Sequence, residues 1–274
     1  GRRALKSYME YGYIPLEDSV KEAYHQREQT SRTLEYAYDD FALAQVSKML
    51  GESDDYNVLI ERSKNYRNVI DPQSGYANGR YADGSLYEGA NPYTFAFYIT
   101  EGAPCHYTWY VPHDVQGLMD AMGGRDMFVA KLDTLFEQNL YWHGNEPCHQ
   151  VAYLYNDAGE AWKTQKYVRH ILDSEYGDSP GGLAGNDDAG QMSAWYVFSS
   201  LGFYPVCPGT PYYYIGTPTF ERAVLHLENG RTFTIVAHGV SKENCYIKSA
   251  KLNGKPYEST KIHHDDIMAG GIME

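Results

Sequence analysis

Residues Thr33–Leu50, TLEYAYDDFALAQVSKML, form the clearest helical segment of the chain. Apolar side chains recur there every three or four positions, which is the spacing of one face of an α-helix; they are Leu34, Ala37, Tyr38, Phe41 and Ala44. Gly51 follows at a position where glycine commonly ends a helix. The pattern therefore predicts a long helix over residues 33–50.

Similar stripes occur further along the chain. One lies over residues 126–138, and another begins at Met192 and ends before Gly202. Additional helices are expected near residues 17–28, 54–67, 108–122 and 163–175. The intervening segments are rich in Gly, Pro, Asn and Asp and predict loops over residues 71–106, 139–150 and 176–190. Loops this long in a compact domain commonly carry function.

The pattern changes after Tyr204, where four prolines interrupt helical periodicity. Strands are predicted over 223–227 and 232–237, around an Asn229-Gly230 turn, and over 245–252 before Asn253-Gly254. The fold class is therefore mainly α with a β tail. We predict a helical region over residues 1–204 and a small antiparallel β module over residues 205–274.

Composition limits the possible partners. The 274 residues include 36 acidic and 23 basic side chains, a net charge of −13, whereas a nucleic-acid partner requires clustered Lys and Arg. No apolar run reaches the roughly 18 residues of a membrane span. Four cysteines form neither a CxxC pair nor a zinc pattern. The chain begins Gly-Arg-Arg without a visible signal peptide, which indicates a processed or excised fragment.

Aromatic residues make up 15% of the chain, with 27 tyrosines. Rings with a polar tip suit surfaces that stack on sugars, but the same rings also fill helical cores. Both interpretations stay open for any single tyrosine.

The first candidate segment, residues 100–114, reads TEGAPCHYTWYVPHD. Glu101, beside Gly102 and close to Trp109, could be desolvated, which favours the protonated form that a general acid needs. Trp109 and His113 are candidates for contacts with a substrate. As an alternative, a Glu before a Gly is commonly a solvated turn residue.

The second candidate segment, residues 141–147, reads YWHGNEP. Trp142 could stack on a sugar ring, and His143 lies beside it. Asn145 and Glu146 offer the hard oxygen ligands that calcium prefers. As an alternative, Asn145 caps a turn and Glu146 precedes a proline kink without any ligand.

The third candidate segment, residues 185–191, reads GNDDAGQ and precedes the helix that contains Trp195. Adjacent Asp residues at a helix N-terminus are well explained as caps. Only one of Asp187 and Asp188 can occupy the cap, so the other is free to accept a proton. Glycoside hydrolysis needs two carboxyl groups, and Glu101 with Asp188 would supply them, about 6.5–9.5 Å apart in an inverting enzyme.

Together these segments resemble glycoside hydrolase family 92, the exo-acting α-mannosidases, of which many are bacterial. The resemblance extends over nearly the whole chain and rests on TLEYAYDDFALAQ (33–45), ERSKNYRN (61–68), YTWYVPHDVQG (107–117), WHGNEP (142–147), YLYN (153–156), GNDDAGQMSAWYVFSSLGFYP (185–205), NGRTFTI and LNGKPY. It implies that the helical region is part of a six-hairpin α/α toroid. It also implies inversion at the anomeric carbon, a calcium ion that binds mannose hydroxyls, and an amino-terminal β-sandwich that is absent here.

Carried over by position, Glu101 is similar to the general acid of the family and Asp188 to the base that activates water. Asn186 stands where some members have a second Asp, and Asp187 is kept as a further catalytic candidate. The resemblance places calcium near Asn145 and Glu146. It also places Trp142 and His143 at the mannose subsite, with a packing role for Trp142 as the alternative. It implies N-glycan-type mannosides as partners and a periplasmic, secreted or cell-surface location.

The chain departs from the family pattern beside Glu101, and two other classes of protein share some of its features. Residues 102–106 read GAPCH where the family usually has Gly-Asn-Ala-Trp-Gln, so linkage specificity could differ from the common α-1,2 pattern. A calcium-dependent carbohydrate-binding chain without catalysis would use the same loops. Another α/α-toroid enzyme, such as a polysaccharide lyase, fits the helices but not the specific motifs.

Overall fold

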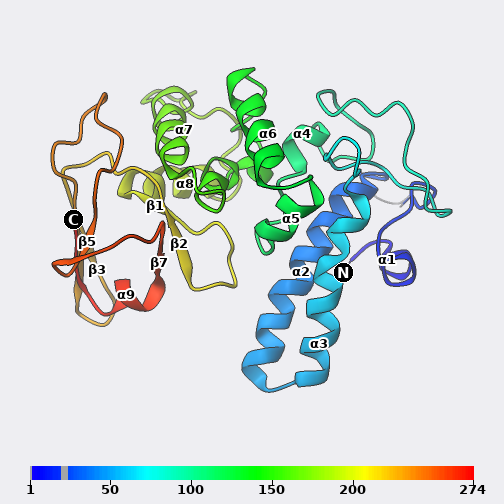
Figure 1. Cartoon of the computed structure of the whole chain (residues 1–274), viewed down its shortest axis with the longest axis horizontal. Helices are drawn as coiled ribbons and strands as arrows, with labels where there is room; N and C mark the ends of the chain where they lie inside the picture. Colours follow the sequence, from blue (N-terminus) through cyan, green and yellow to red (C-terminus); the bar gives the residue numbers. More distant parts are fainter. Residues whose placement is uncertain (1, 20–23) are drawn as a thin grey trace. The chain divides into compact units, whose positions relative to one another are not determined.

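The structure is a computed structural model that describes residues 2–19 and 24–274 (Figure 1). Contacts between Cα atoms divide the chain into two compact units, residues 1–142 and residues 143–274. This division is based on contacts, whereas the predicted boundary after residue 204 separates the helical part of the sequence from the strands. That domain boundary stays a prediction.

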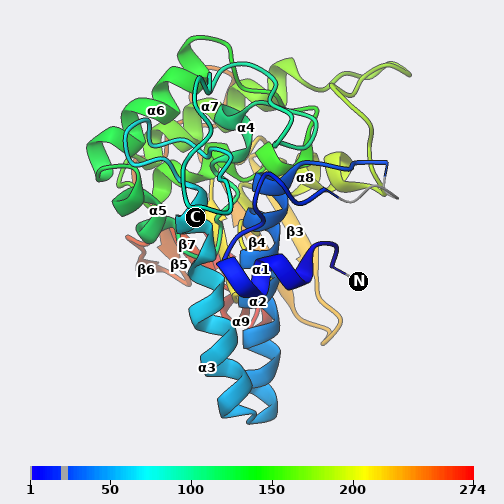
Figure 2. The ribbon, with the colours of Figure 1, turned by 90° about the vertical axis from the view of Figure 1, so that its right-hand side faces the viewer.

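The first unit is helical, and its longest helices are α2 and α3, which lie side by side as a hairpin (Figure 2). Gly51 ends α2 with a positive φ of 80°, as its position predicts. The elements of this unit are α1 (Leu5–Tyr11), α2 (Gln29–Leu50), α3 (Ser53–Arg62), the 3₁₀ helix η1 (Ser63–Val69), α4 (Pro104–Tyr107), α5 (Val115–Ala121) and α6 (Arg125–Glu137).

One predicted helix of this unit is wrong. The described residues of the 17–28 segment form turns and bends, and residues 20–23 lie outside the described residues. Gln29 instead begins α2, with its side-chain amide donating to the carbonyls of Leu16 and Asp18. Residues 16–18 are therefore held against the start of α2 by polar contacts that periodicity does not reveal.

A buried ion cluster joins the elements of the first unit. Asp40 of α2 has a fully buried side chain and accepts hydrogen bonds from Arg62 Nε and Nη2 at 2.6 and 2.8 Å. Arg2 donates to the same carboxylate at 2.6 Å, and the Tyr8 hydroxyl donates at 3.1 Å. A buried carboxylate is stable only when it is fully paired, so this cluster fixes α1, α2 and α3 relative to one another.

The second unit begins with helices and ends in strands. Its helical elements are η2 (Glu146–Cys148), η3 (Val151–Asn156), α7 (Ala161–Ser174), α8 (Gln191–Leu201) and α9 (His264–Met268). Its strands are β1 (Phe203–Tyr204), β2 (Tyr212–Ile215), β3 (Arg222–His226), β4 (Thr232–Val236), β5 (Lys251–Leu252), β6 (Lys255–Pro256), β7 (Lys261–His263) and β8 (Gly271–Met273).

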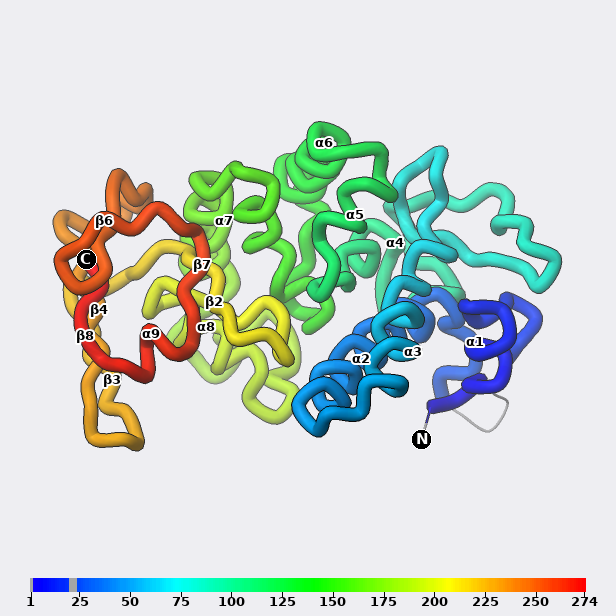
Figure 3. Tube along the Cα trace, turned by 60° about the horizontal axis from the view of Figure 1, so that its bottom comes forward, coloured from blue at the N-terminus to red at the C-terminus, as the bar shows by residue number. Residues whose placement is uncertain are grey.

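The strands form two sheets with orders β1-β2-β7 and β3-β4-β8-β5-β6. β3 and β4 pair antiparallel around the predicted Asn229-Gly230 turn, with Leu225 opposite Phe233. The strand nearest the end of the chain, β8, lies between β4 and β5 and runs parallel to β4. Figure 3 shows β8 beside β4. Buried side chains from both sheets and from α9 make one cluster: Phe203, Phe233, Ile235, Ile262 and Ile267.

The predicted strand over residues 245–252 is mostly wrong, because only Lys251 and Leu252 join the sheet. The segment before them is held by side chains of other elements instead. Thr217 Oγ1 donates to the Cys245 carbonyl at 2.8 Å, and the Ile247 N–H donates to Gln165 Oε1 at 2.9 Å. These bonds replace the strand pairing that the alternation of apolar and polar residues predicts.

The predicted fold class is confirmed: the chain is mainly helical with a small, largely antiparallel strand region at its carboxyl-terminal end. Within the described residues, every helix is too short or too polar to cross a bilayer.

Candidate active site

Glu101 lies in the first unit on a strained turn. Its φ is +50°, a left-handed conformation that non-glycine residues adopt infrequently and that often marks functional sites. The Ser31 hydroxyl accepts the N–H of the preceding Thr100 at 2.7 Å. The side chain of Glu101 is 60% exposed, and its Oε1 lies 3.5 Å from His25 Nε2. The expected desolvation of Glu101 by Trp109 is therefore wrong in this chain.

Trp109 is a core residue of the first unit. Its ring is fully buried and meets Phe128 edge-on at 5.2 Å, and its indole N–H donates to the Cys105 carbonyl at 2.8 Å. The expectation that Trp109 contacts substrate is corrected, because this packing leaves the ring without a solvent-facing side.

His113 is also held by packing. Its ring stacks on Tyr38 at 5.9 Å and on Phe41 at 5.4 Å, and Nε2 donates to the Ser63 carbonyl at 2.9 Å. Burial lowers the pKa of His113, so its ring is neutral at physiological pH. These contacts connect the loop after Glu101 to α2 and η1.

The segment that departs from the family pattern forms the short helix α4. Pro104 begins α4, and His106 Nδ1 accepts the Ala103 N–H at 3.2 Å while Nε2 donates to the Leu140 carbonyl at 2.9 Å. The His106 ring also lies 6.0 Å from the ring of Trp142, which is 37% exposed. His106 thus attaches the loop that carries Glu101 to the segment that carries Trp142.

In the second unit, a buried network joins two of the candidate segments. His143 Nε2 donates to the Tyr176 hydroxyl at 2.7 Å, and that hydroxyl donates to the Met192 carbonyl at 3.0 Å. The ring of His143 stacks on His149 at 4.7 Å and meets Trp195 at 4.4 Å. The WHGNEP segment and the start of α8 are therefore in direct contact through these rings.

His149 extends the same network. Its Nε2 donates to the His143 carbonyl at 3.0 Å, and Nδ1 accepts from the Gln191 side chain at 3.2 Å. Gln191 also donates to the Tyr204 hydroxyl at 3.0 Å, and the Trp195 indole donates to the His149 carbonyl at 2.9 Å. Each ring nitrogen of His149 therefore has a partner suited to a neutral imidazole.

Burial sets the charge of both histidines. It lowers the pKa of His143 to about 3, with a further lowering from His149, and it lowers the pKa of His149 to about 4. Both rings are neutral at physiological pH. The network can therefore orient neighbouring groups by hydrogen bonding without adding positive charge near the candidate carboxylates.

Asp187 and Asp188 have different environments. Asp187 accepts the Ser193 N–H at 2.9 Å and the Ser193 hydroxyl at 3.1 Å, and its carbonyl accepts the Gln191 N–H at 2.8 Å. Asp188 is exposed, and its carboxylate has no hydrogen bond or ion pair with the part of the chain that the structure describes. Gly190, not an Asp, is the N-cap of α8, and Asp187 binds the first turn of the helix through Ser193. The role of Asp188 as a proton acceptor stays a prediction.

The turn that presents Asp188 is strained. Asp188, Ala189 and Gly190 have φ values of 41°, 59° and 95°, three left-handed residues in succession. The turn is also held close to the WHGNEP segment, since a Cβ on Gly185 would lie 2.5 Å from the Gly144 carbonyl oxygen. Glycine at 185 is therefore required by the approach of these two segments. Asn186, next to it, is exposed.

The expected calcium ligands lie on a short 3₁₀ turn. Asn145 is 6% exposed and precedes η2 without a side-chain capping bond, so its expected role as a cap is not realised. Glu146 is the first residue of η2. Their oxygens suit calcium, which takes six to eight ligands, but two side chains are too few. No cluster of three or more His, Cys, Asp or Glu suited to a metal occurs among residues 2–19 and 24–274.

Glu101 belongs to the first unit and Asp188 to the second, so their expected separation stays a prediction.

Sequence patterns missed His25 and His149. His25 lies in a segment whose expected structure was a helix. The spacing of His143 and His149 around Pro147 was a possible signal for the second residue, because a proline-containing 3₁₀ turn can bring two such rings together.

Comparison with known proteins identifies the family to which this chain belongs. A description of the glycosyl hydrolase family 92 catalytic domain matches residues 1–274, so the site is built on the scaffold of a glycosidase family. The chain belongs to glycoside hydrolase family 92. The expected resemblance is thereby confirmed, and the helices belong to the α/α toroid of this family.

Among solved structures, the chain is similar to a family GH92 α-mannosidase, BT3965, from Bacteroides thetaiotaomicron, with a TM-score of 0.92 and 43% identity over 98% of this chain. It is also similar to the inverting mannosidase BT2199 of the same organism, with a TM-score of 0.91 and 35% identity over 100% of this chain. A secreted glycosidase of Arthroderma benhamiae is 32% identical over 301 residues. The chain spans 36%, 39% and 39% of the lengths of these relatives, respectively.

Proposed function

We propose that this chain is the carboxyl-terminal catalytic part of an α-mannosidase that releases mannose from α-mannosides by inverting hydrolysis. The observation that carries the proposal is Asp188, an exposed carboxylate on a strained turn beside a neutral histidine network. Such a carboxylate can accept a proton from water, because neither an ion pair nor a cap occupies it.

In the proposed reaction, Asp188 removes a proton from water as the water attacks the anomeric carbon. Glu101 donates its proton to the leaving glycosidic oxygen, so the bond to the aglycone breaks while the new C–O bond forms on the opposite face. Asp187 acts as a positioning residue, because its two hydrogen bonds with Ser193 fix the turn that carries Asp188. Trp142 and Asn186 are proposed to line the mannose subsite, while His143, whose ring is buried against His149 and Trp195, is proposed to position the segment that carries Trp142.

Calcium is part of the proposal, with Asn145 and Glu146 as two of its ligands. The ion would supply hard-cation binding of mannose hydroxyls, and main-chain carbonyls, water or a more amino-terminal carboxylate would complete its coordination. We also propose that the β-sandwich expected from the resemblance is a partner of this chain, and that the whole protein acts on N-glycan-type, α-1,2-linked mannosides outside the cytoplasm.

The test is mannose release from α-1,2-linked mannobiose, with excess calcium and with a chelator, by the chain alone and with an added family β-sandwich region. NMR of the first product gives its anomeric form, and β-mannose is expected from inversion. Asp188→Asn and Glu101→Gln should each abolish release. Full activity of either variant would refute the assigned roles, and α-mannose as the first product would refute inversion.

A second candidate function is calcium-dependent carbohydrate binding without catalysis. The altered segment around His106 favours it, because the residues beside the proposed acid differ from the usual pattern. Mannose-containing glycans that bind without turnover, even when the amino-terminal region is supplied, would support this candidate over the enzyme.

A further inference from the structure

Two large aromatic side chains of the second unit are exposed next to each other. Trp162, near the start of α7, is 48% exposed, and Tyr246, in the segment that was expected to be a strand, is 54% exposed. Their ring centroids lie 6.5 Å apart with an interplanar angle of 56°. The two rings therefore form an open corner that leaves part of each aromatic surface in contact with water.

The surroundings restrain both aromatic residues. The Trp162 indole N–H donates to Glu160 Oε2 at 2.8 Å. The backbone on both sides of Tyr246 is held in place, because the Cys245 carbonyl accepts from Thr217 and the Ile247 N–H donates to Gln165. Exposed aromatic rings that are fixed in advance lose little conformational entropy when a ligand binds.

The groups around the rings carry both signs of charge. The Lys163 ammonium lies 5.5 Å from the Trp162 ring centroid, and Glu160 lies at the indole nitrogen. An ammonium donates hydrogen bonds and a carboxylate accepts them, so hydroxyl groups can be recognised in both ways. A ligand with many hydroxyls and no net charge matches this mixture better than an anion or a cation does.

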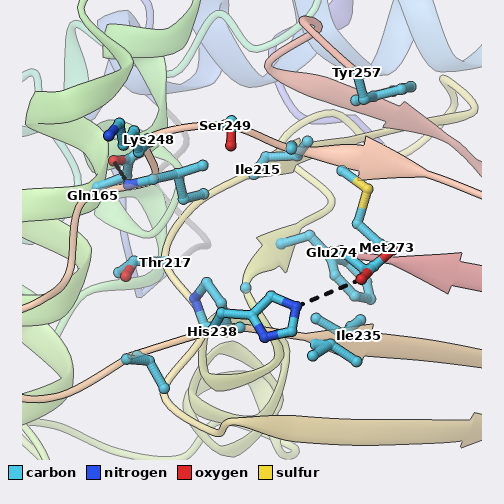
Figure 4. A pocket seen from close by; sticks show the side chains of 18 of the residues that line it. Gln165, Ile215, Thr217, Ile235, His238, Lys248, Ser249, Tyr257, Met273 and Glu274 are labelled. Carbon is cyan, nitrogen blue, oxygen red and sulfur yellow. Dashed lines mark hydrogen bonds and ion pairs between the residues drawn. The ribbon is translucent and has the colours of Figure 1, made fainter. Parts of the chain in front are cut away.

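Tyr246 also lines an open cavity of about 730 Å³. Figure 4 shows Gln165 and Lys248 close together at one side of it, and His238 paired with Glu274 elsewhere. The volume falls within the range of small-molecule sites, roughly 300–1,000 Å³. The aromatic corner therefore continues into a hollow with polar groups at its edge.

We propose that Trp162 and Tyr246 form a second glycan-binding site, which stacks one pyranose ring of a neutral oligosaccharide and directs the next sugar toward the cavity. The apolar C–H face of the sugar packs on the rings while its hydroxyls meet Lys163 and Glu160. Neither aromatic residue belongs to the segments of the candidate active site. The site rests on the proposed function only for the choice of α-mannan as the first ligand.

The test is retardation of the 274-residue chain in native gels that contain soluble α-mannan, performed in a Glu101→Gln/Asp188→Asn background so that turnover plays no part. Trp162→Ala and Tyr246→Ala are each expected to weaken binding at least about tenfold. Trp162→Phe, which keeps a ring, should retain most of it. Phe220→Ala is the matched control, because Phe220 is a 54% exposed aromatic of the same unit.

A second readout uses fluorescence in a Trp142→Phe variant, in which Trp162 is the most exposed indole, since Trp109 and Trp195 are fully buried. Bound α-mannan should protect this indole from acrylamide quenching. Absence of retardation, or equal retardation of Trp162→Ala and Phe220→Ala, would overturn the proposal. It would also be overturned if Trp162→Ala abolished self-association of the chain without changing α-mannan binding. Binding in this background, combined with no mannose release by the unsubstituted chain even when the amino-terminal region is supplied, would support the site while contradicting the proposed enzyme.

Discussion

Acidification from pH 7.5 to pH 5 is expected to destabilise the second unit, because His143 and His149 are buried as neutral rings. Burial lowers their pKa values to about 3 and about 4, whereas a histidine in an unfolded chain has a pKa of about 6.5. Between these values the unfolded state binds more protons than the folded state. Stability is therefore fully present above pH 6.5 and falls as the pH decreases toward 4.

The loss of stability at pH 5 follows from the difference between this pH and the pKa of histidine in the unfolded chain. At pH 5, about 1.5 units below the unfolded pKa, each histidine lowers the free energy of unfolding by about 2 kcal/mol, at roughly 1.4 kcal/mol per unit. The two residues together lower it by about 4 kcal/mol, which is a large fraction of the stability of an ordinary domain.

Urea unfolding at both pH values, followed by tryptophan fluorescence, measures this loss. His149→Gln removes one titrating ring and should reduce the pH-dependent loss by about 2 kcal/mol, whatever its effect at pH 7.5. His226→Gln is the control, because His226 is exposed on β3. An unchanged pH dependence in His149→Gln would refute the reasoning, as would an NMR titration of the His143 ring near pH 6.5.

Three further perturbations test other parts of the chain. Asp40→Ala should destabilise the first unit by about 3–5 kcal/mol in urea unfolding, because it leaves two partly buried arginines and the buried Tyr8 hydroxyl without their shared carboxylate. Gly185→Ala should strongly reduce the rate of mannose release while changing the melting temperature little, because its methyl group would displace the Asp188 turn from Gly144. Glu35→Gln should raise stability at pH 7, with the gain vanishing near pH 4. Burial raises the pKa of Glu35, so the unfolded state loses its proton first as the pH rises.

Matched variants provide the controls. Asp39→Ala changes the neighbouring carboxylate, which is 51% exposed, and should cost much less than Asp40→Ala. Gly181→Ala lies in the same loop as Gly185, where an added Cβ has open space. Equal effects within either pair would contradict the structural explanation, and a Glu35→Gln gain that persists at pH 4 would exclude the titration of Glu35 as its cause.

Local periodicity predicted the elements whose contacts are mainly along one face. The helix over residues 33–50 is α2 with four earlier residues added, and the helix over residues 126–138 is α6 shifted by one residue. The predicted strand was wrong over residues 245–250 because their hydrogen-bond partners, Thr217 and Gln165, belong to distant parts of the chain. Such tertiary hydrogen bonds leave no local pattern.

The candidate site divides in the same way. That one of Asp187 and Asp188 would bind N–H groups at the start of α8 was predictable, because a helix N-terminus attracts a carboxylate. The sequence did not show that Asp187 does so, through Ser193 and not as the N-cap. The burial of Trp109 was not predictable, since a tryptophan beside a loop carboxylate suits a core or a sugar equally well. The pairing of His143 with His149 required the 3₁₀ turn at Pro147 to be known.

The position of β8 has a consequence for biosynthesis. This strand is the last along the chain, yet it joins β4 on one side and β5 on the other. While the ribosome is still making residues 271–273, the β3–β4 hairpin and the β5–β6 hairpin cannot be connected into one sheet. The backbone edges of β4 and β5 therefore stay open to chaperones or to wrong partners until synthesis of these residues is complete.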